Sequence, residues 1–155
     1  MDTSSFFNYP TLPARPQPAA SLETDLLAGH TEDDWAVLLS YFETRRFHPG
    51  DWLIREGEAE RALYLLSDGK LEVHTGGIGG QVVEAPATLG EEAFLDGQPS
   101  AAGLRALTHG EAQRLSFEAF EVLSAREPRL ARDLLLDLGR LVATELRRLQ
   151  SPDRG

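Results

Sequence analysis

Between residues 52 and 115 the chain consists of short apolar runs separated by turn-forming residues. Three of these turns are Ser67-Asp68-Gly69-Lys70, Gly76 to Gly80, and Thr108 to Glu111. The Asp-Gly pair in the first turn predicts a β-hairpin, because both residues tolerate the positive backbone angles of a tight turn. Many short strands at close spacing are typical of a β-sandwich or a jelly-roll β-barrel, the double-stranded β-helix. The predicted strands are Trp52 to Ile54, Ala62 to Leu66, Leu71 to His74, Gln81 to Glu84, Leu104 to Leu107, and Ala112 to Leu115.

A helix is predicted before this β region. Apolar residues from Trp35 to Phe42 recur at i, i+3, i+4 and i+7, which places them on one helix face. Thr31 with Asp34 is a weak form of the capping box and predicts that the helix begins near Thr31. Residues 1–22 are rich in proline and show no periodicity, so they are predicted to form a flexible tail.

Helical periodicity returns after the β region. Ser116 is the predicted N-cap of a helix over residues 117–124, and Pro128 fits the first turn of a second, longer helix. The leucines of the second helix recur at intervals close to 3.5 residues and widen to a run at Leu134 to Leu136. Two interpretations follow: the helix forms a dimer seam, which we favour, or it folds back over the barrel. The helix ends before a polar tail at residues 151–155, and its spaced leucines are Leu130, Leu134, Leu138, Leu141, Leu146 and Leu149.

The charge of the chain argues against a direct nucleic-acid partner. The net charge is −10. The excess of negative charge lies in the residues before Arg129, because the segment from Arg129 onward is net positive. An acidic body repels phosphate backbones, whose non-specific binding depends on cationic side chains. The sequence has no cysteine, no apolar run of membrane-spanning length and no secretory signal pattern. We therefore predict a cytoplasmic protein with no membrane partner.

No motif in the sequence predicts an enzyme. The four histidines, at positions 30, 48, 74 and 109, are far apart and form no metal-ligating pair. Gly76 to Gly80 lacks the Lys-Ser/Thr of a phosphate-binding loop and is predicted to be a flexible hairpin tip. No grouping of Ser, His and Asp indicates a nucleophile. A small jelly-roll enzyme is therefore the least favoured function, and neither a metal nor a catalytic residue is predicted.

The stretch from Leu89 to Ala102, LGEEAFLDGQPSAA, resembles the phosphate-binding cassette of the cyclic-nucleotide-binding domain family. That family's cassette reads F-G-E-[LI]-A-L-L, a short turn, and then P-R-A-A. Gly90 and Glu91 match its Gly-Glu pair, and the matches at its other end are Pro99, Ala101 and Ala102. Arg45 to Glu58 resembles the family's entry block, and Leu63 to Val73 resembles its next pair of strands. Together these blocks identify residues 23–150 as one domain of this family.

The resemblance implies roles for the cassette residues and exposes two departures. In the family the Glu binds the ribose 2′-hydroxyl, the Arg pairs with the cyclic phosphate, and amides beside the small residues complete the site. Ser100 stands where the Arg belongs, and Glu92 stands where the family has an apolar residue. Arg105 follows the cassette and is expected on the barrel surface. The candidate ligand-binding residues are Gly90, Glu91, Ser100, Ala101 and Ala102.

The departures weaken the case for ordinary cyclic AMP binding. Loss of one partner of a buried charge pair costs about 3–5 kcal/mol, and Ser100 supplies only one neutral hydrogen bond. Glu91 has two interpretations, as a hydroxyl acceptor or as a cap for nearby amides. Glu92 either adds a second carboxylate to the site or turns to solvent. Both pairs of interpretations stay open.

The sequence therefore favours a non-enzymatic regulatory module of this fold that acts through protein contacts, as a homodimer joined by the C-terminal helix. The alternative is a sensor that binds a cyclic nucleotide or another small ligand through the Glu91 cassette. No cofactor is expected beyond such a ligand. The family's transcriptional members carry a DNA-reading module after the long helix, and because the sequence stops at Gly155 we expect none here.

Overall fold

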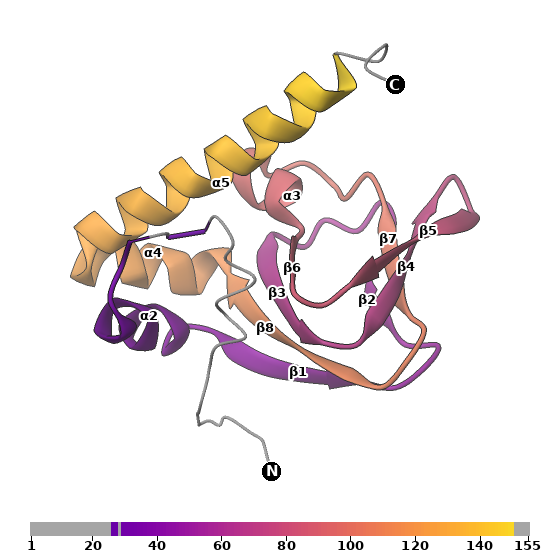
Figure 1. Ribbon diagram of the computed structural model, residues 1–155, viewed down its shortest axis with the longest axis horizontal. Coiled ribbons are helices and arrows are strands. Elements are labelled where there is room, and N and C mark those ends of the chain that lie inside the picture. The colour runs from indigo at the N-terminus through magenta and orange to yellow at the C-terminus, as the bar shows by residue number, and fades with distance from the viewer. Residues whose placement is uncertain (1–25, 28, 151–155) are drawn as a thin grey trace.

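The computed structural model describes residues 26–27 and 29–150 and folds them into two four-stranded sheets with helices on one side (Figure 1). Sheet A has the strand order β1-β8-β3-β6, and sheet B has the order β2-β7-β4-β5. The predicted tails at residues 1–22 and 151–155 lie outside the described residues. The strands are β1 Glu43–Phe47, β2 Trp52–Ile54, β3 Ala62–Asp68, β4 Lys70–Thr75, β5 Ile78–Glu84, β6 Ala87–Leu89, β7 Gly103–Ala106 and β8 Gly110–Ser116. The helices are α2 Glu32–Leu39, α3 Glu91–Asp96, α4 Phe117–Arg126 and α5 Pro128–Leu149.

This arrangement confirms the predicted jelly-roll fold with flanking helices and a long C-terminal helix. Every strand pair is antiparallel, and consecutive strands alternate between the two sheets at most connections. That alternation is what rolls a chain of short strands into two facing sheets. None of the described helices has the length and apolar character needed to cross a membrane.

The predicted hairpin at Asp68-Gly69 is wrong. Strands β3 and β4 flank this turn but belong to different sheets, so the turn carries the chain from one sheet to the other. Gly69 has φ 104°, and a Cβ there would lie 2.9 Å from the carbonyl oxygen of His109. The sequence located the turn correctly. Gly69 packs against the connection between β7 and β8, and β4 therefore joins sheet B instead of pairing with β3. The hairpin of sheet B is β4–β5, which turns at Gly76 and Gly77.

The helix caps form as predicted. The Thr31 hydroxyl accepts a hydrogen bond from the Asp34 amide at 3.1 Å, and the Ser116 hydroxyl accepts one from the Ala119 amide at 3.0 Å. Pro128 is the first residue of α5, where its missing N–H has no cost. These local signals account for where α2, α4 and α5 begin.

Strand β3 lies at the centre of the molecule and is buried on both faces. Leu63 and Leu65 face the helices, where they pack with apolar residues of α2, α4 and α5. Tyr64 and Leu66 face the inside of the roll, against side chains of sheet B. All of the long helices therefore lie on the sheet A side, and Figure 1 shows no helix over the outer face of sheet B.

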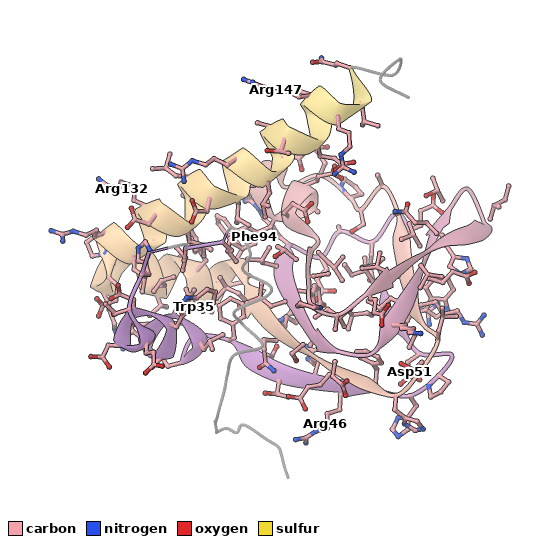
Figure 2. The ribbon with its side chains drawn as sticks, viewed as in Figure 1. Trp35, Arg46, Asp51, Phe94, Arg132 and Arg147 are labelled. Atoms are coloured by element: carbon pink, nitrogen blue, oxygen red, sulfur yellow. The ribbon has the colours of Figure 1, made fainter. Side chains whose placement is uncertain are left out.

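Helix α5 is buried along its first half and exposed along its second. Leu134 and Leu138 are fully buried, whereas Leu146 and Leu149 are 53% and 69% exposed. Figure 2 shows Arg132 and Arg147 pointing away from the body of the protein on this helix. The back-folding interpretation therefore describes the first half of α5 and leaves its second half with exposed leucines.

Candidate functional site

The cassette crosses from sheet A to sheet B, between β6 and β7, and contains the short helix α3. Gly90 precedes the helix with φ 77°, a left-handed conformation that favours glycine. A Cβ at Gly90 would lie 2.9 Å from the Ala62 carbonyl oxygen and 3.5 Å from the Ile54 side chain. Glycine at this position therefore lets the start of α3 lie directly against β3.

The other end of the cassette is fixed by backbone hydrogen bonds. The Ser100 carbonyl accepts from the Gly57 amide at 2.8 Å, and the Ser100 amide donates to the Glu58 carbonyl at 3.0 Å. Gly90 at one end and Ser100 at the other thus pack against the same segment, residues 54–58. Ala101 is exposed and Ala102 is half-buried, and they lead directly into β7. Backbone contacts therefore fix both ends of the cassette.

The electrostatics of the cassette are negative. Glu91 is half-buried at the start of α3, and its burial raises the pKa of its carboxyl above the usual range. Its own backbone amide partly offsets this rise, and the charges of Glu92 and Glu145 add to it. The Glu92 side chain is exposed, as one interpretation expected, yet its charge still acts on Glu91. The carboxylates of Glu91, Glu92 and Glu145 would repel an anion bound at the cassette.

Two arginines that could supply the missing cation, Arg61 and Arg105, have other partners. Arg61 donates to the carbonyl oxygens of Phe94 at 2.8 Å and Leu95 at 3.1 Å, at the end of α3. Its guanidinium also lies 3.7 Å from the centre of the Phe117 ring. Arg105 lies on the outer face of sheet B, as predicted, and donates to the Gly50 carbonyl at 3.3 Å. Both cations therefore hold protein structure.

A third arginine, Arg114 of β8, lies on the face of sheet A that looks into the roll. It donates to Glu60 at 2.7 Å, to Glu43 at 2.8 Å and to the Tyr64 hydroxyl at 3.2 Å. Burial alone would lower the pKa of Arg114, but the bonds to Glu60 and Tyr64 raise it above its usual range. Burial likewise opposes ionisation of Glu43, whose pKa Arg114 and Arg45 nevertheless hold below its usual range. This charge is neutralised within the fold.

The remaining chemistry of the described residues gives no second candidate for the cassette's role. Two surface hollows, of about 360 and 380 Å³, are lined by residues outside the cassette. In the part of the chain that the structure describes, no three His, Asp or Glu side chains lie close enough together to hold a metal ion. The cassette thus stays the candidate ligand site predicted from the sequence.

Sequence reasoning missed three residues that shape the site. Arg61 holds the end of α3, Glu145 reaches the cassette from α5, and Glu56 accepts hydrogen bonds from the Gly76 amide at 3.0 and 2.9 Å. The Glu56 bonds anchor the hairpin tip that we predicted to be flexible. All three act across long sequence separations, so no local pattern could have indicated them.

Comparison with known proteins agrees with this geometry. The model of the cyclic nucleotide-binding domain family matches residues 44–127. A cAMP-dependent protein kinase regulatory subunit from Emericella nidulans is 32% identical over 108 residues, which cover 65% of this chain and 25% of that protein. The chain therefore spans about a quarter of the length of this curated relative.

Solved structures share the fold. A cyclic nucleotide-binding domain from Methylobacillus flagellatus superposes with a TM-score of 0.77 at 23% identity, covering 89% of this chain and 80% of that one. The catabolite activator protein of Thermus thermophilus gives a TM-score of 0.68 at 27% identity, with 81% of this chain and 62% of that one covered.

Proposed function

Because the chain belongs to the cyclic nucleotide-binding domain family, we propose that it is a non-enzymatic regulatory module whose cassette binds a cyclic phosphate weakly or not at all. The observation that carries this proposal is the charge of the cassette. Ser100 stands where the family has an arginine. The negative charges of Glu92 and Glu145 also raise the pKa of Glu91. A module of this kind passes its signal on through protein contacts.

The physical argument concerns the cost of a buried anion. A cyclic phosphate carries a full negative charge, and a guanidinium compensates it with two parallel hydrogen bonds. Without that partner the loss of about 3–5 kcal/mol weakens a micromolar ligand by two or three orders of magnitude. Arg61, Arg105 and Arg114 hold other groups, so each would have to give up its present bonds to replace the missing cation.

Calorimetric titration of the protein with cyclic AMP and with cyclic GMP tests the proposal. We expect dissociation constants no tighter than about 0.1 mM for both nucleotides, as follows from the lost charge pair. Micromolar binding of either nucleotide would overturn the proposal and would show that the cassette works without its arginine.

The intact backbone of the cassette favours a second candidate, a sensor for a different small ligand. Gly90 keeps its left-handed conformation, and both backbone groups of Ser100 are fixed. Glu91 would then accept a hydrogen bond from a hydroxyl or amine of an uncharged ligand. Calorimetry with adenosine, which lacks the phosphate, separates the candidates: adenosine binding tighter than cyclic AMP supports the sensor, and no binding leaves the protein-contact module.

We also propose that the exposed leucines of α5 join two copies of the protein. Leu136, Leu146 and Leu149 are 52%, 53% and 69% exposed, a cost that a dimer seam would remove. Sedimentation velocity at tens of micromolar should show a dimer, and Leu146→Glu with Leu149→Glu should give a monomer. A monomeric wild-type protein would contradict this.

A cytoplasmic location stays a prediction.

A further inference from the structure

Figure 1 draws no described helix over the outer face of sheet B, and the strand register places a row of side chains on this face. Trp52 of β2, Arg105 of β7, Glu72 of β4 and Val82 of β5 are cross-strand neighbours in that order. Arg55 follows β2 and lies at the same end of the row. We call these residues the arginine–tryptophan face. It lies on the opposite side of the roll from α2, α4 and α5.

Trp52 is held rigidly at one end of this face. Its ring packs on glycine backbone, since a Cβ at Gly103 would lie 3.0 Å from the ring. The His74 ring meets it edge-on at 5.0 Å, and His74 in turn pairs with Glu72 at 2.9 Å. The guanidiniums of Arg55 and Arg105 lie 5.6 and 5.9 Å from the ring centre. The result is an indole flanked by two cations.

These two cations differ from those of sheet A. Arg45, Arg46 and Arg114 on sheet A each pair with a carboxylate. Within residues 26–27 and 29–150, neither Arg55 nor Arg105 has a carboxylate within ion-pair distance. The chain has 25 acidic residues against 15 basic ones, so carboxylates are not scarce. Even the neighbouring Glu72 bonds to His74 instead of Arg105.

We propose that the arginine–tryptophan face docks an acidic, partly apolar segment of a partner protein. Carboxylates of the segment would pair with Arg55 and Arg105, and its apolar side chains would pack on Trp52 and on Val82, which is 51% exposed. Tryptophan and arginine dominate the binding energy of protein interfaces, and charge-assisted hydrogen bonds fix the register. The chain's net charge of −10 disfavours nucleic acid as the source of the negative charge.

The arginine–tryptophan face is joined to the cassette by a single turn, residues 55–58. The proposal for this face rests on the proposed function of the protein as a module that acts through protein contacts. Arg55 begins this turn, and its carbonyl accepts from the Glu58 amide at 3.0 Å. Gly57 and Glu58 in the same turn hold Ser100. Glu56 holds the β4–β5 hairpin tip at Gly76. Hydrogen bonds of this one turn therefore connect Ser100 of the cassette to Arg55.

Fluorescence anisotropy with a fluorescein-labelled, glutamate-rich decapeptide that contains leucine tests the proposal. We expect saturable binding that weakens with added salt, because exposed charge pairs are screened. Arg55→Gln combined with Arg105→Gln should weaken it about tenfold, from two lost charge-assisted contacts. Arg126→Gln combined with Arg129→Gln removes the same charge from α4 and α5, and it should change the affinity less than about twofold.

Three outcomes would overturn the proposal. Equal loss in both double variants would mean that the peptide responds to the net charge and not to this face. Equal or tighter binding of oligothymidylate would assign the face to nucleic acid. Wild-type self-association that Arg55→Gln with Arg105→Gln abolishes would assign it to a second copy of the chain. Each outcome is separate from the cyclic nucleotide titration, which reports on the cassette.

Discussion

The cassette and the arginine–tryptophan face lie at either side of the Arg55–Glu58 turn and carry opposite charge. In the cassette, burial and the carboxylates of Glu92 and Glu145 raise the pKa of Glu91, and its own backbone amide lowers it. On the face, Arg55 and Arg105 lie beside an indole, with no carboxylate partner in the described part of the chain. The comparison shows a cassette whose charge is negative, beside an outer face that carries two arginines without a carboxylate partner among the described residues.

Restoring the cation to the cassette should have the largest effect. Ser100→Arg places a guanidinium where the family has one, and we expect cyclic AMP affinity to rise about a hundredfold, as a regained buried charge pair implies. Isothermal titration calorimetry measures the change. Ser40→Arg at the exposed end of α2 is the matched control and should have no effect. A failure of Ser100→Arg would mean that the carboxylates, rather than the missing arginine, exclude the anion.

Gly90→Ala tests whether the cassette backbone is a structural requirement of the fold. The substitution combines a left-handed conformation with a contact to the Ala62 carbonyl, so it should destabilise the protein by about 2–4 kcal/mol. Urea denaturation measures this. Gly80→Ala in β5 is the control, since a Cβ there has nothing within 4 Å. Equal stability of the two variants would contradict the packing described for the start of α3.

Arg61→Met sharpens the contrast between structural and free arginines. It removes two charged hydrogen bonds to the end of α3 and the guanidinium that lies over the Phe117 ring, so a loss of about 2–3 kcal/mol is expected. Arg55→Met on the arginine–tryptophan face should cost less than about 0.5 kcal/mol. Urea denaturation measures the loss of stability in both variants. Equal losses in Arg61→Met and Arg55→Met would contradict the view that Arg61 stabilises the fold and Arg55 does not.

Glu91→Gln should have the smallest effect, and the size of this effect depends on pH. The raised pKa of Glu91 means that its ionised form opposes folding, so the wild-type protein loses stability as pH rises through that pKa. The glutamine variant should therefore be more stable at pH 8, and the gain should vanish below about pH 4, where carboxyls are neutral. Glu121→Gln on α4 is the control. A variant that is less stable at pH 8 would assign Glu91 a stabilising role as an amide cap.

The sequence predicted the elements whose signals are local. Thr31, Ser116 and Pro128 mark helix starts because capping depends on a few adjacent residues. Strands β1 and β6 were missed: four of the five β1 residues are exposed and β6 has three residues, so neither shows an alternating pattern. The Asp68-Gly69 turn was located correctly, but its connection was not, since which sheet receives a strand depends on packing across the whole roll.

The candidate site was predictable in position and only partly in chemistry. The family spacing located Gly90, Glu91 and Ser100 at the two ends of a segment that the structure anchors on residues 54–58. The charge at Glu145 and the bonds of Arg61 depend on α5 and α3 meeting in space. Long-range electrostatics of this kind leave no pattern in the sequence.

The most direct test of the account is a titration of the ¹⁵N-labelled wild-type protein with cyclic AMP, followed by NMR at the amides of the cassette. We expect the shifts at Gly90, Glu91, Ala101 and Ala102 to show no midpoint below about 0.1 mM nucleotide, because the loss of a buried charge pair weakens a micromolar ligand by two or three orders of magnitude. Saturable shifts at these four amides with a micromolar midpoint would contradict it.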